Sequence, residues 1–167
     1  MLTRVSDANP AAAGRLIVVS GLPATGKTTL ARQLEHALGA VRLSPDEWMA
    51  DLEIDLFDRS SRGRIEQLQW RLAQRLLGLG TTVIIEWGTW GRAERDALRE
   101  GARQIGAAVE LRFLDAPLNV LWARVQDRDM ERRLGHRPLT PADLEEWAAI
   151  IQRPDAEELS LFDLPSQ

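Results

Sequence analysis

The sequence of 167 residues contains no cysteine, no tyrosine and a single lysine, Lys27. Without cysteine the chain forms no disulfide and offers no thiolate ligand to zinc. The two histidines, His36 and His136, lie too far apart in the sequence for a local zinc motif. Oxygen ligands remain, and magnesium is the metal that prefers them.

Long apolar runs are also missing. The longest strongly apolar stretch near the N-terminus is Leu16 to Val19, far below the roughly 18 residues that a membrane span requires. No basic and then apolar leader precedes it, so we expect a cytoplasmic protein without a membrane partner. The net charge of −4 disfavours, without excluding, a surface for long nucleic acids, because such surfaces depend on clustered Lys and Arg.

Short apolar runs alternate with amphipathic segments along the chain. We expect strands at 16–20, 41–43, 82–86 and 109–114, with a fifth strand left open at 159–164, and helices at 26–38, 62–78, 92–104, from 117 onward, and at 140–152. This alternation predicts a three-layer α/β domain with a parallel sheet of four to five strands. Residues 1–14 are polar and aperiodic and are interpreted as a flexible lead-in, and 15–167 as one domain.

Two local patterns give more specific expectations. In the helix at 62–78, leucine and isoleucine recur at three- and four-residue steps and predict the buried face: Ile65, Leu68, Leu72, Leu76 and Leu79. Ser44 and Thr140 each precede a proline and have an acid three residues later, so both are predicted to begin helices as capping boxes.

The segment after the first strand carries the most specific motif. It reads Gly21-Leu22-Pro23-Ala24-Thr25-Gly26-Lys27-Thr28 and matches G-x-x-x-x-G-K-[ST] at every specified position. In such a loop the glycines let the backbone N–H groups surround a phosphate, and the following helix adds its positive end. Lys27 is predicted to reach the β- and γ-phosphates, and the Thr28 hydroxyl to bind magnesium. The chain is therefore predicted to bind ATP and Mg²⁺ with this loop and the adjacent Thr29.

Together with three other features, this loop resembles a known group of enzymes. An acid follows the second strand (Asp46), another ends the third strand (Glu86), and a late helix carries Arg124, Arg128 and Arg132. Over about residues 15–153 the chain resembles the small P-loop kinases, AAA-type ATP-binding kinases that include chloramphenicol phosphotransferase, gluconate kinase, the zeta toxins and the 5′-hydroxyl polynucleotide kinases. The resemblance implies a P-loop NTPase fold with an arginine-bearing helical lid at about 124–140.

The resemblance also implies roles for the acids. Asp46 would accept the proton of the acceptor hydroxyl, although an acid in a first helical turn also stabilises the helix dipole. Glu47 is interpreted as the capping partner of Ser44. Glu86 would contact magnesium through water or bind the acceptor, and Asp115 is either a fourth strand-end acid or a solvated turn residue.

The arginines of the late helix follow at four-residue steps and would share one face. They would close over the triphosphate, with Arg128 the best single candidate for catalysis. The alternative is a solvated face paired with neighbouring acids.

Three tryptophans follow strand ends close to the proposed catalytic acids. Trp48, Trp87 and Trp90 are predicted to line an acceptor pocket, although packing explains such residues equally well. Arg92 and Arg95 would bind an anionic part of the acceptor or remain exposed helix charges.

The sequence thus predicts a kinase that transfers the γ-phosphate of ATP to a hydroxyl of a small acceptor, such as an antibiotic, a sugar or a nucleoside-like compound. Two alternatives remain open: a 5′-hydroxyl polynucleotide kinase, and a nucleotide-binding regulator or slow NTPase. The acceptor's identity and the oligomeric state are left open.

Overall fold

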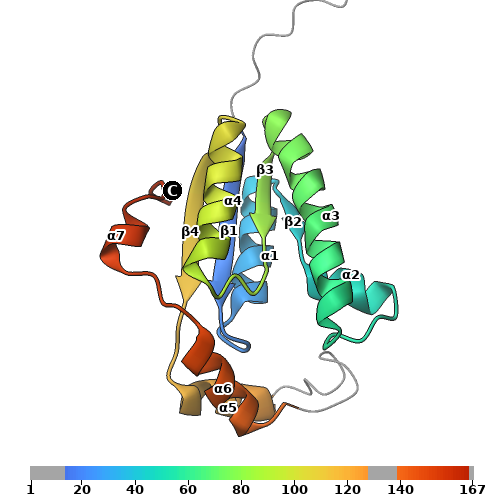
Figure 1. The fold of residues 1–167 in the computed structure, drawn as a ribbon, viewed down its shortest axis with the longest axis vertical. Coiled ribbons are helices and arrows are strands. Elements are labelled where there is room, and N and C mark those ends of the chain that lie inside the picture. Colours follow the sequence, from blue (N-terminus) through green and yellow to red (C-terminus); the bar gives the residue numbers. More distant parts are fainter. Residues whose placement is uncertain (1–13, 128–138, 166–167) are drawn as a thin grey trace, which may run out of the picture.

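The computed structural model describes residues 14–127 and 139–165 (Figure 1). Four parallel strands form its sheet in the order β2-β3-β1-β4. Their bounds are β1 (Arg15–Gly21), β2 (Val41–Leu43), β3 (Thr82–Ile85) and β4 (Ala108–Leu114). No fifth strand occurs among these residues, because the segment left open at 159–164 contains the end of a short helix and turns.

Helices cover both faces of the sheet, which confirms the predicted three-layer α/β fold. Figure 1 shows α1 (Lys27–Leu38) behind the sheet and α3 (Arg59–Gly78) and α4 (Arg92–Gln104) in front of it. The short α2 (Pro45–Asp51) follows β2. Beyond the carboxyl ends of the strands lie α5 (Leu118–Asp127) and α6 (Pro141–Ile150), and α7 (Ala156–Leu159) lies beside β4 (Figure 1).

The central strand β1 divides its side chains between two cores. Leu16 and Val18 pack with residues of α3 and α4, whereas Ile17 and Val19 pack with residues of α1. This alternation is the period of a strand, and all four side chains are fully buried. Each contributes roughly 1.5–3 kcal/mol through burial, which fixes the strand whose end carries the glycine loop.

A third core cluster joins the glycine loop to the helices beyond the sheet. Leu22 and Ala24 of the loop pack with Leu121 and Val125 of α5 and with Leu144 of α6. The loop is therefore supported from below by β1 and from the side by these two helices.

The buried face of α3 differs from the predicted one. Its fully or largely buried residues are Ser61, Ile65, Gln69, Ala73 and Leu77, at steps of four. Of the predicted leucines, Leu68 is 49% exposed and Leu79 is 73% exposed. Leucines occur on several sides of this helix, so their spacing does not identify the face, whereas small side chains allow close packing on the sheet.

The two predicted capping boxes have different outcomes. Thr140 caps α6 as expected, since its hydroxyl accepts from the Asp143 N–H and the Asp143 carboxylate accepts from the Thr140 N–H. Ser44 precedes α2 without a capping hydrogen bond from its side chain. A helix begins after Ser44 as predicted, but the capping box does not form, because arginines of α1 and β2 bind the Glu47 carboxylate instead.

At its N-terminal end the described structure begins with Gly14. Its carbonyl accepts from the Ala108 N–H, and a Cβ on it would meet the Leu77 carbonyl oxygen at 2.5 Å. Gly14 is therefore part of the domain, and the rest of the predicted lead-in, 1–13, lies outside the described residues. Within those residues no helix combines the length and the apolar character of a membrane span.

Candidate active site

A cleft of about 1750 Å³ opens at the carboxyl ends of the strands. It is lined by the glycine loop, α2, α3, the segment after β3, the first turns of α4, and α6. Ligands of open α/β sheets bind at this edge. Pockets for a single small ligand measure roughly 300–1000 Å³, so the cleft has room for two ligands side by side.

The glycine loop has the backbone that the motif requires. Gly21 has φ +143°, and a Cβ on it would meet the Leu114 carbonyl oxygen at 2.3 Å. Gly26 has φ +100° and caps the start of α1. Both positions therefore need glycine, and together they turn the chain so that the N-terminal N–H groups of α1 face the loop.

Lys27 lies over this loop. Its Nζ donates to the Leu22 carbonyl at 2.9 Å. Burial lowers the pKa of Lys27 to about 8, while the carboxylates of Glu86 and Asp46 oppose that change. The lysine is thus held close to two acids in a site that disfavours its charge, and an anionic phosphate would stabilise that charge.

Thr28 and Glu86 meet beside the loop. The Thr28 hydroxyl donates to Oε1 of the buried Glu86, and Arg42 Nη1 donates to its Oε2 at 2.9 Å. A hydroxyl and a carboxylate next to a phosphate cradle fit Mg²⁺, which binds through one or two protein oxygens and several waters. In the described ranges, 14–127 and 139–165, no group of three or more His, Cys, Asp or Glu residues could hold a metal ion. A magnesium ion beside Thr28 and Glu86 would therefore depend on waters for further ligands.

Arg42 in β2 is a site residue that the sequence analysis missed. It bonds Glu35 at 3.0 Å, Glu47 at 2.7 Å and Glu86 at 2.9 Å. Burial disfavours its charge, but the hydrogen bonds to Glu47 and Glu35 raise the pKa of Arg42 above its ordinary value. Its position between two apolar residues of a short strand gave no sign of this role, because its three carboxylate partners come from separate segments of the chain.

Asp46 lines the same cleft as the glycine loop. Its carboxylate is exposed and accepts one bond from Arg62 Nη2 at 2.6 Å. The neighbouring Glu47 is held differently: burial alone would raise its pKa, but Arg32 and Arg42 keep the pKa of Glu47 below its ordinary value. Asp46 is therefore the acid of α2 that is open to a ligand.

Arg62 was also missed, although the sequence carried a signal for it. The residues of α3 that line the cleft recur at helical spacing beside the buried face: Arg59, Arg62, Gly63, Glu66, Gln67 and Trp70. A helix face that stays polar at this spacing over several turns is a signal that can be read from the sequence.

Of the three predicted acceptor tryptophans, Trp87 and Trp90 line the cleft. Trp87 Nε1 donates to Gln69 Oε1 at 2.9 Å, and Trp90 Nε1 donates to the Gly21 carbonyl at 3.3 Å. Trp48 is not among the lining residues and packs on the core instead. It follows Asp46 by two residues, which is about 200° around α2, so the two side chains face opposite ways.

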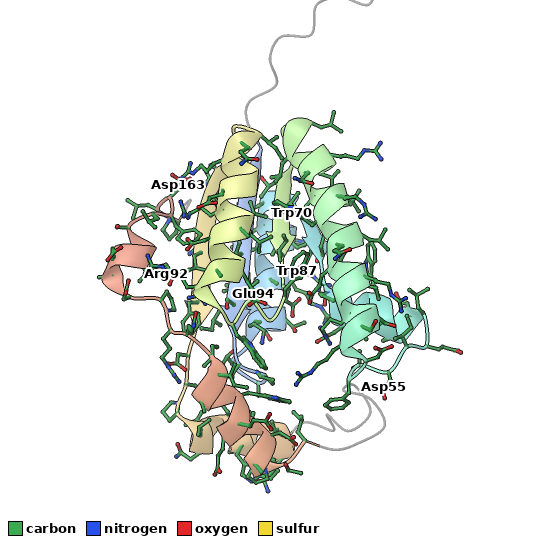
Figure 2. All side chains as sticks on the ribbon, in the orientation of Figure 1. Asp55, Trp70, Trp87, Arg92, Glu94 and Asp163 are labelled. Atoms are coloured by element: carbon green, nitrogen blue, oxygen red, sulfur yellow. The ribbon has the colours of Figure 1, made fainter. Side chains whose placement is uncertain are left out.

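Arg92, another predicted acceptor residue, also lies outside the cleft lining. It faces the C-terminal segment, with Asp155 at 3.8 Å and Glu157 at 3.4 Å. The reason is again helical geometry, because Glu94, two residues further along α4, is the residue that faces the cleft (Figure 2). The structure does not bring Arg92 to the other predicted acceptor residues.

Arg95, which the sequence left between acceptor binding and exposure, is fully buried. It forms two hydrogen bonds to Glu158 of α7, at 2.6 and 2.9 Å, and donates to the carbonyls of Thr89 and Trp90, each at 3.1 Å. Arg95 thus fixes the segment that carries Trp87 and Trp90 into the cleft.

We expect Glu158→Gln to destabilise the fold by roughly 3–5 kcal/mol, because it leaves the buried Arg95 guanidinium without a counter-charge. Urea unfolding checks this. Glu157→Gln is the matched control, since the Glu157 side chain is 80% exposed and its removal should cost less than about 1 kcal/mol. Equal stabilities of the two variants would contradict a structural role for the buried pair.

The predicted arginine lid lies partly outside the described residues. Arg124 of α5 donates to the Ala24 carbonyl of the glycine loop at 3.2 Å. Arg128 and Arg132 lie in the segment 128–138, outside those residues. Asp115 pairs with Arg153 at 2.6 Å, which lowers the pKa of Asp115, and neither residue lines the cleft.

Comparison with known protein families shows which family the chain belongs to. A family model described as AAA domain (AAA_33) matches residues 16–154. The chain belongs to this family. The predicted membership of the small P-loop kinase group, which includes the AAA-type kinases, is thereby confirmed.

This AAA domain has relatives among known proteins and solved structures. An uncharacterized protein of Mycobacterium tuberculosis is 30% identical over 75% of the chain, and the chain spans 27% of that relative's length. A shikimate kinase of Ruegeria pomeroyi is 31% identical over 74% of the chain and 63% of its own length. A solved structure from Chloroflexus aurantiacus, described as a candidate kinase, has a TM-score of 0.66 and 27% identity over 85% of this chain and 82% of its own.

Proposed function

We propose that this AAA domain transfers the γ-phosphate of ATP to a hydroxyl group of a small-molecule acceptor. One observation carries the proposal: the exposed carboxylate of Asp46 and the P-loop residues Lys27 and Thr28 line one cleft. A nucleotide switch needs the P-loop and magnesium, but it does not need an exposed carboxylate beside the γ-phosphate position.

The cleft divides into two halves that suit the two substrates. The glycine loop and α1 hold the triphosphate through backbone N–H groups and Lys27. On the other side, α3 and α4 offer a wall for the acceptor, with Asp46 between the halves. Arg62 holds the Asp46 carboxylate by one bond at 2.6 Å and so leaves its remaining lone pairs for the acceptor hydroxyl.

The proposed reaction is a displacement at phosphorus. The acceptor oxygen forms a bond to the γ-phosphorus while the bond from that phosphorus to the β,γ-bridging oxygen breaks, and ADP leaves. The hydroxyl proton passes to Asp46. Magnesium, held by Thr28 and Glu86 together with phosphate oxygens, would neutralise charge on the triphosphate.

The direct test is a screen of acceptors with purified protein, ATP and Mg²⁺. The panel contains sugars, aminoglycosides, nucleosides and 5′-hydroxyl oligonucleotides, and each reaction is read as ADP release and as an acceptor heavier by one phosphoryl group. Transfer to a small hydroxyl compound supports the proposal. ADP release without any phosphorylated acceptor would instead favour an NTPase or a nucleotide switch.

We expect the lid arginines to act mainly on turnover. Replacing Arg124 and Arg128 together by alanine should lower kcat by about tenfold or more and change ATP affinity much less, because charge on the γ-phosphate must be neutralised most during transfer. Steady-state kinetics and ATP calorimetry check this. Gln126→Ala on α5 is the control. An unchanged kcat in the double variant would show that these arginines form a solvated helix face and do not act on the phosphates.

A further inference from the structure

The acceptor half of the cleft has an unusual combination of polar and aromatic walls. Figure 2 shows Trp70, Trp87 and Glu94 gathered between α3 and α4. Glu66 of α3 lines the same region. This part of the cleft therefore combines two indoles with two carboxylates.

Two partly buried indoles, Trp70 and Trp87, line this part of the cleft. The Nε1 donor of Trp87 is already used by Gln69, so its remaining binding surface is the ring. Trp70 is fixed against α4, where a Cβ on Gly101 would approach its Cζ2 to 2.7 Å. Both rings are thus held in place by the fold, and the face of an indole attracts cations.

The two carboxylates form no ion pair among the described residues, although the charge of Arg62 acts on Glu66. No hydrogen bond or ion pair engages Glu66 among the described residues, and Glu94 uses one oxygen, Oε2, to accept from the Gly91 N–H at 2.9 Å. Burial raises the pKa of Glu66, Arg62 opposes this, and the charges of Glu94 and Asp46 raise it further. A ligand cation between Glu66 and Glu94 would relieve this repulsion.

The arginines of the cleft are engaged elsewhere. Arg62 binds Asp46 and the Leu56 carbonyl, and Arg32 binds Glu47. Arg59 stands at the first turn of α3, about 10 Å along the helix axis from the level of Glu66. The carboxylates near the glycine loop, Asp46, Glu47 and Glu86, thus each have an arginine partner, whereas Glu66 and Glu94 form no ion pair among the described residues.

A buried hydroxyl supplies an independent sign that a ligand belongs here. Thr89 lines the cleft, is only 6% exposed, and has no hydrogen-bond partner for its Oγ1 within the described part of the chain. Its φ of +32° is unusual for a β-branched residue, and its carbonyl is held by Ser20 and Arg95. Buried hydroxyls normally have partners, and a polar group of a ligand in the cleft is one candidate for this hydroxyl.

On these observations we propose that the acceptor is a hydroxyl compound that carries a protonated amine, and that Glu66, Glu94 and the faces of Trp70 and Trp87 bind the ammonium group. This inference rests on the proposed kinase function and names its substrate class. A metal ion fits the acids poorly, because they form no cluster of three or more ligands among the described residues. An organic cation with N–H donors satisfies the carboxylates and the rings together.

Matched pairs of compounds test the inference. Glucosamine is compared with glucose, and deoxystreptamine with inositol, since the members of each pair differ mainly in their amines. Binding is measured by tryptophan fluorescence and calorimetry with Mg²⁺ and a non-hydrolysable ATP analogue present. At least one amine should bind about tenfold or more tightly than its neutral counterpart.

Two variants then locate the site. Glu66→Gln and Glu94→Gln should each reduce that preference by about tenfold or abolish it, while ATP affinity stays unchanged. Glu100→Gln is the control, because Glu100 is exposed on α4 and does not line the cleft. Circular dichroism confirms that each variant is folded. Equal binding of both members of each pair, absence of binding by every amine, or a preference that survives in both variants would overturn the inference.

Measurement of transfer separates this inference from the proposed function. If neutral sugars or oligonucleotides are phosphorylated and amines are not preferred, the kinase proposal stands and the ammonium site falls. If an amine binds through Glu66 and Glu94 but no compound receives phosphate, the ammonium site stands and hydroxyl transfer falls.

Discussion

Lys27→Ala should lower phosphoryl transfer by about 100- to 1000-fold, the scale on which removal of one fixed charge-stabilising group acts. The fold should remain intact, because burial disfavours the charge of Lys27, as its pKa of about 8 shows, and its hydrogen bond is to a single loop carbonyl. The measurements are kcat, ATP affinity by calorimetry and thermal unfolding.

Lys27→Arg separates charge from geometry at this position. Arginine keeps the positive charge, but its planar fork is wider than an ammonium group and does not lose its proton. Transfer should therefore remain low in this variant. His36→Ala on the exposed side of α1 serves as the control for the helix. Near-normal turnover in either Lys27 variant would contradict the role given to the loop.

Asp46→Asn should lower transfer to the acceptor by roughly 100-fold or more, the usual effect of losing a positioned base. Asparagine keeps the size of the side chain and still accepts a hydrogen bond from Arg62, but it does not take the hydroxyl proton. ATP affinity should persist, because the glycine loop is unchanged. Calorimetry of ATP binding and mass spectrometry of the phosphorylated acceptor measure the two effects separately.

A variant of the same helix provides the matched control for Asp46. Asp51→Asn removes a carboxylate from α2 that does not line the cleft, so its transfer rate should equal that of the wild type. Equal rates in Asp46→Asn and wild type would remove Asp46 from the mechanism and leave Glu86 as the alternative base. Loss of ATP binding or of folding in Asp46→Asn would show that the residue is structural.

The difference between Asp46 and Glu86 illustrates how contacts assign roles to acids that look alike in sequence. Both follow strand ends. Glu86 is buried and holds Thr28 and Arg42, whereas Asp46 is exposed and holds one arginine. The first arrangement suits support of a cation next to the phosphates, and the second suits a base that must meet an incoming hydroxyl.

The sequence by itself determined the layers of the fold and the glycine loop. Short, mainly apolar runs placed the four strands, because strands of a parallel sheet covered on both faces are largely apolar. The motif from Gly21 to Thr28 predicted the turns of this loop, because they depend on local backbone freedom at Gly21 and Gly26, which a motif records directly.

Only the tertiary structure decided which side chains share the cleft. Trp48 and Arg92 lie two residues from Asp46 and Glu94, and the rotation of a helix over that step turns them away from it. The pairing of Arg95 with Glu158 joins residues 63 positions apart, and that of Arg42 with Glu86 joins residues 44 apart. Such partners are selected by the order of strands in the sheet and by the path of the C-terminal segment, which no local pattern contains.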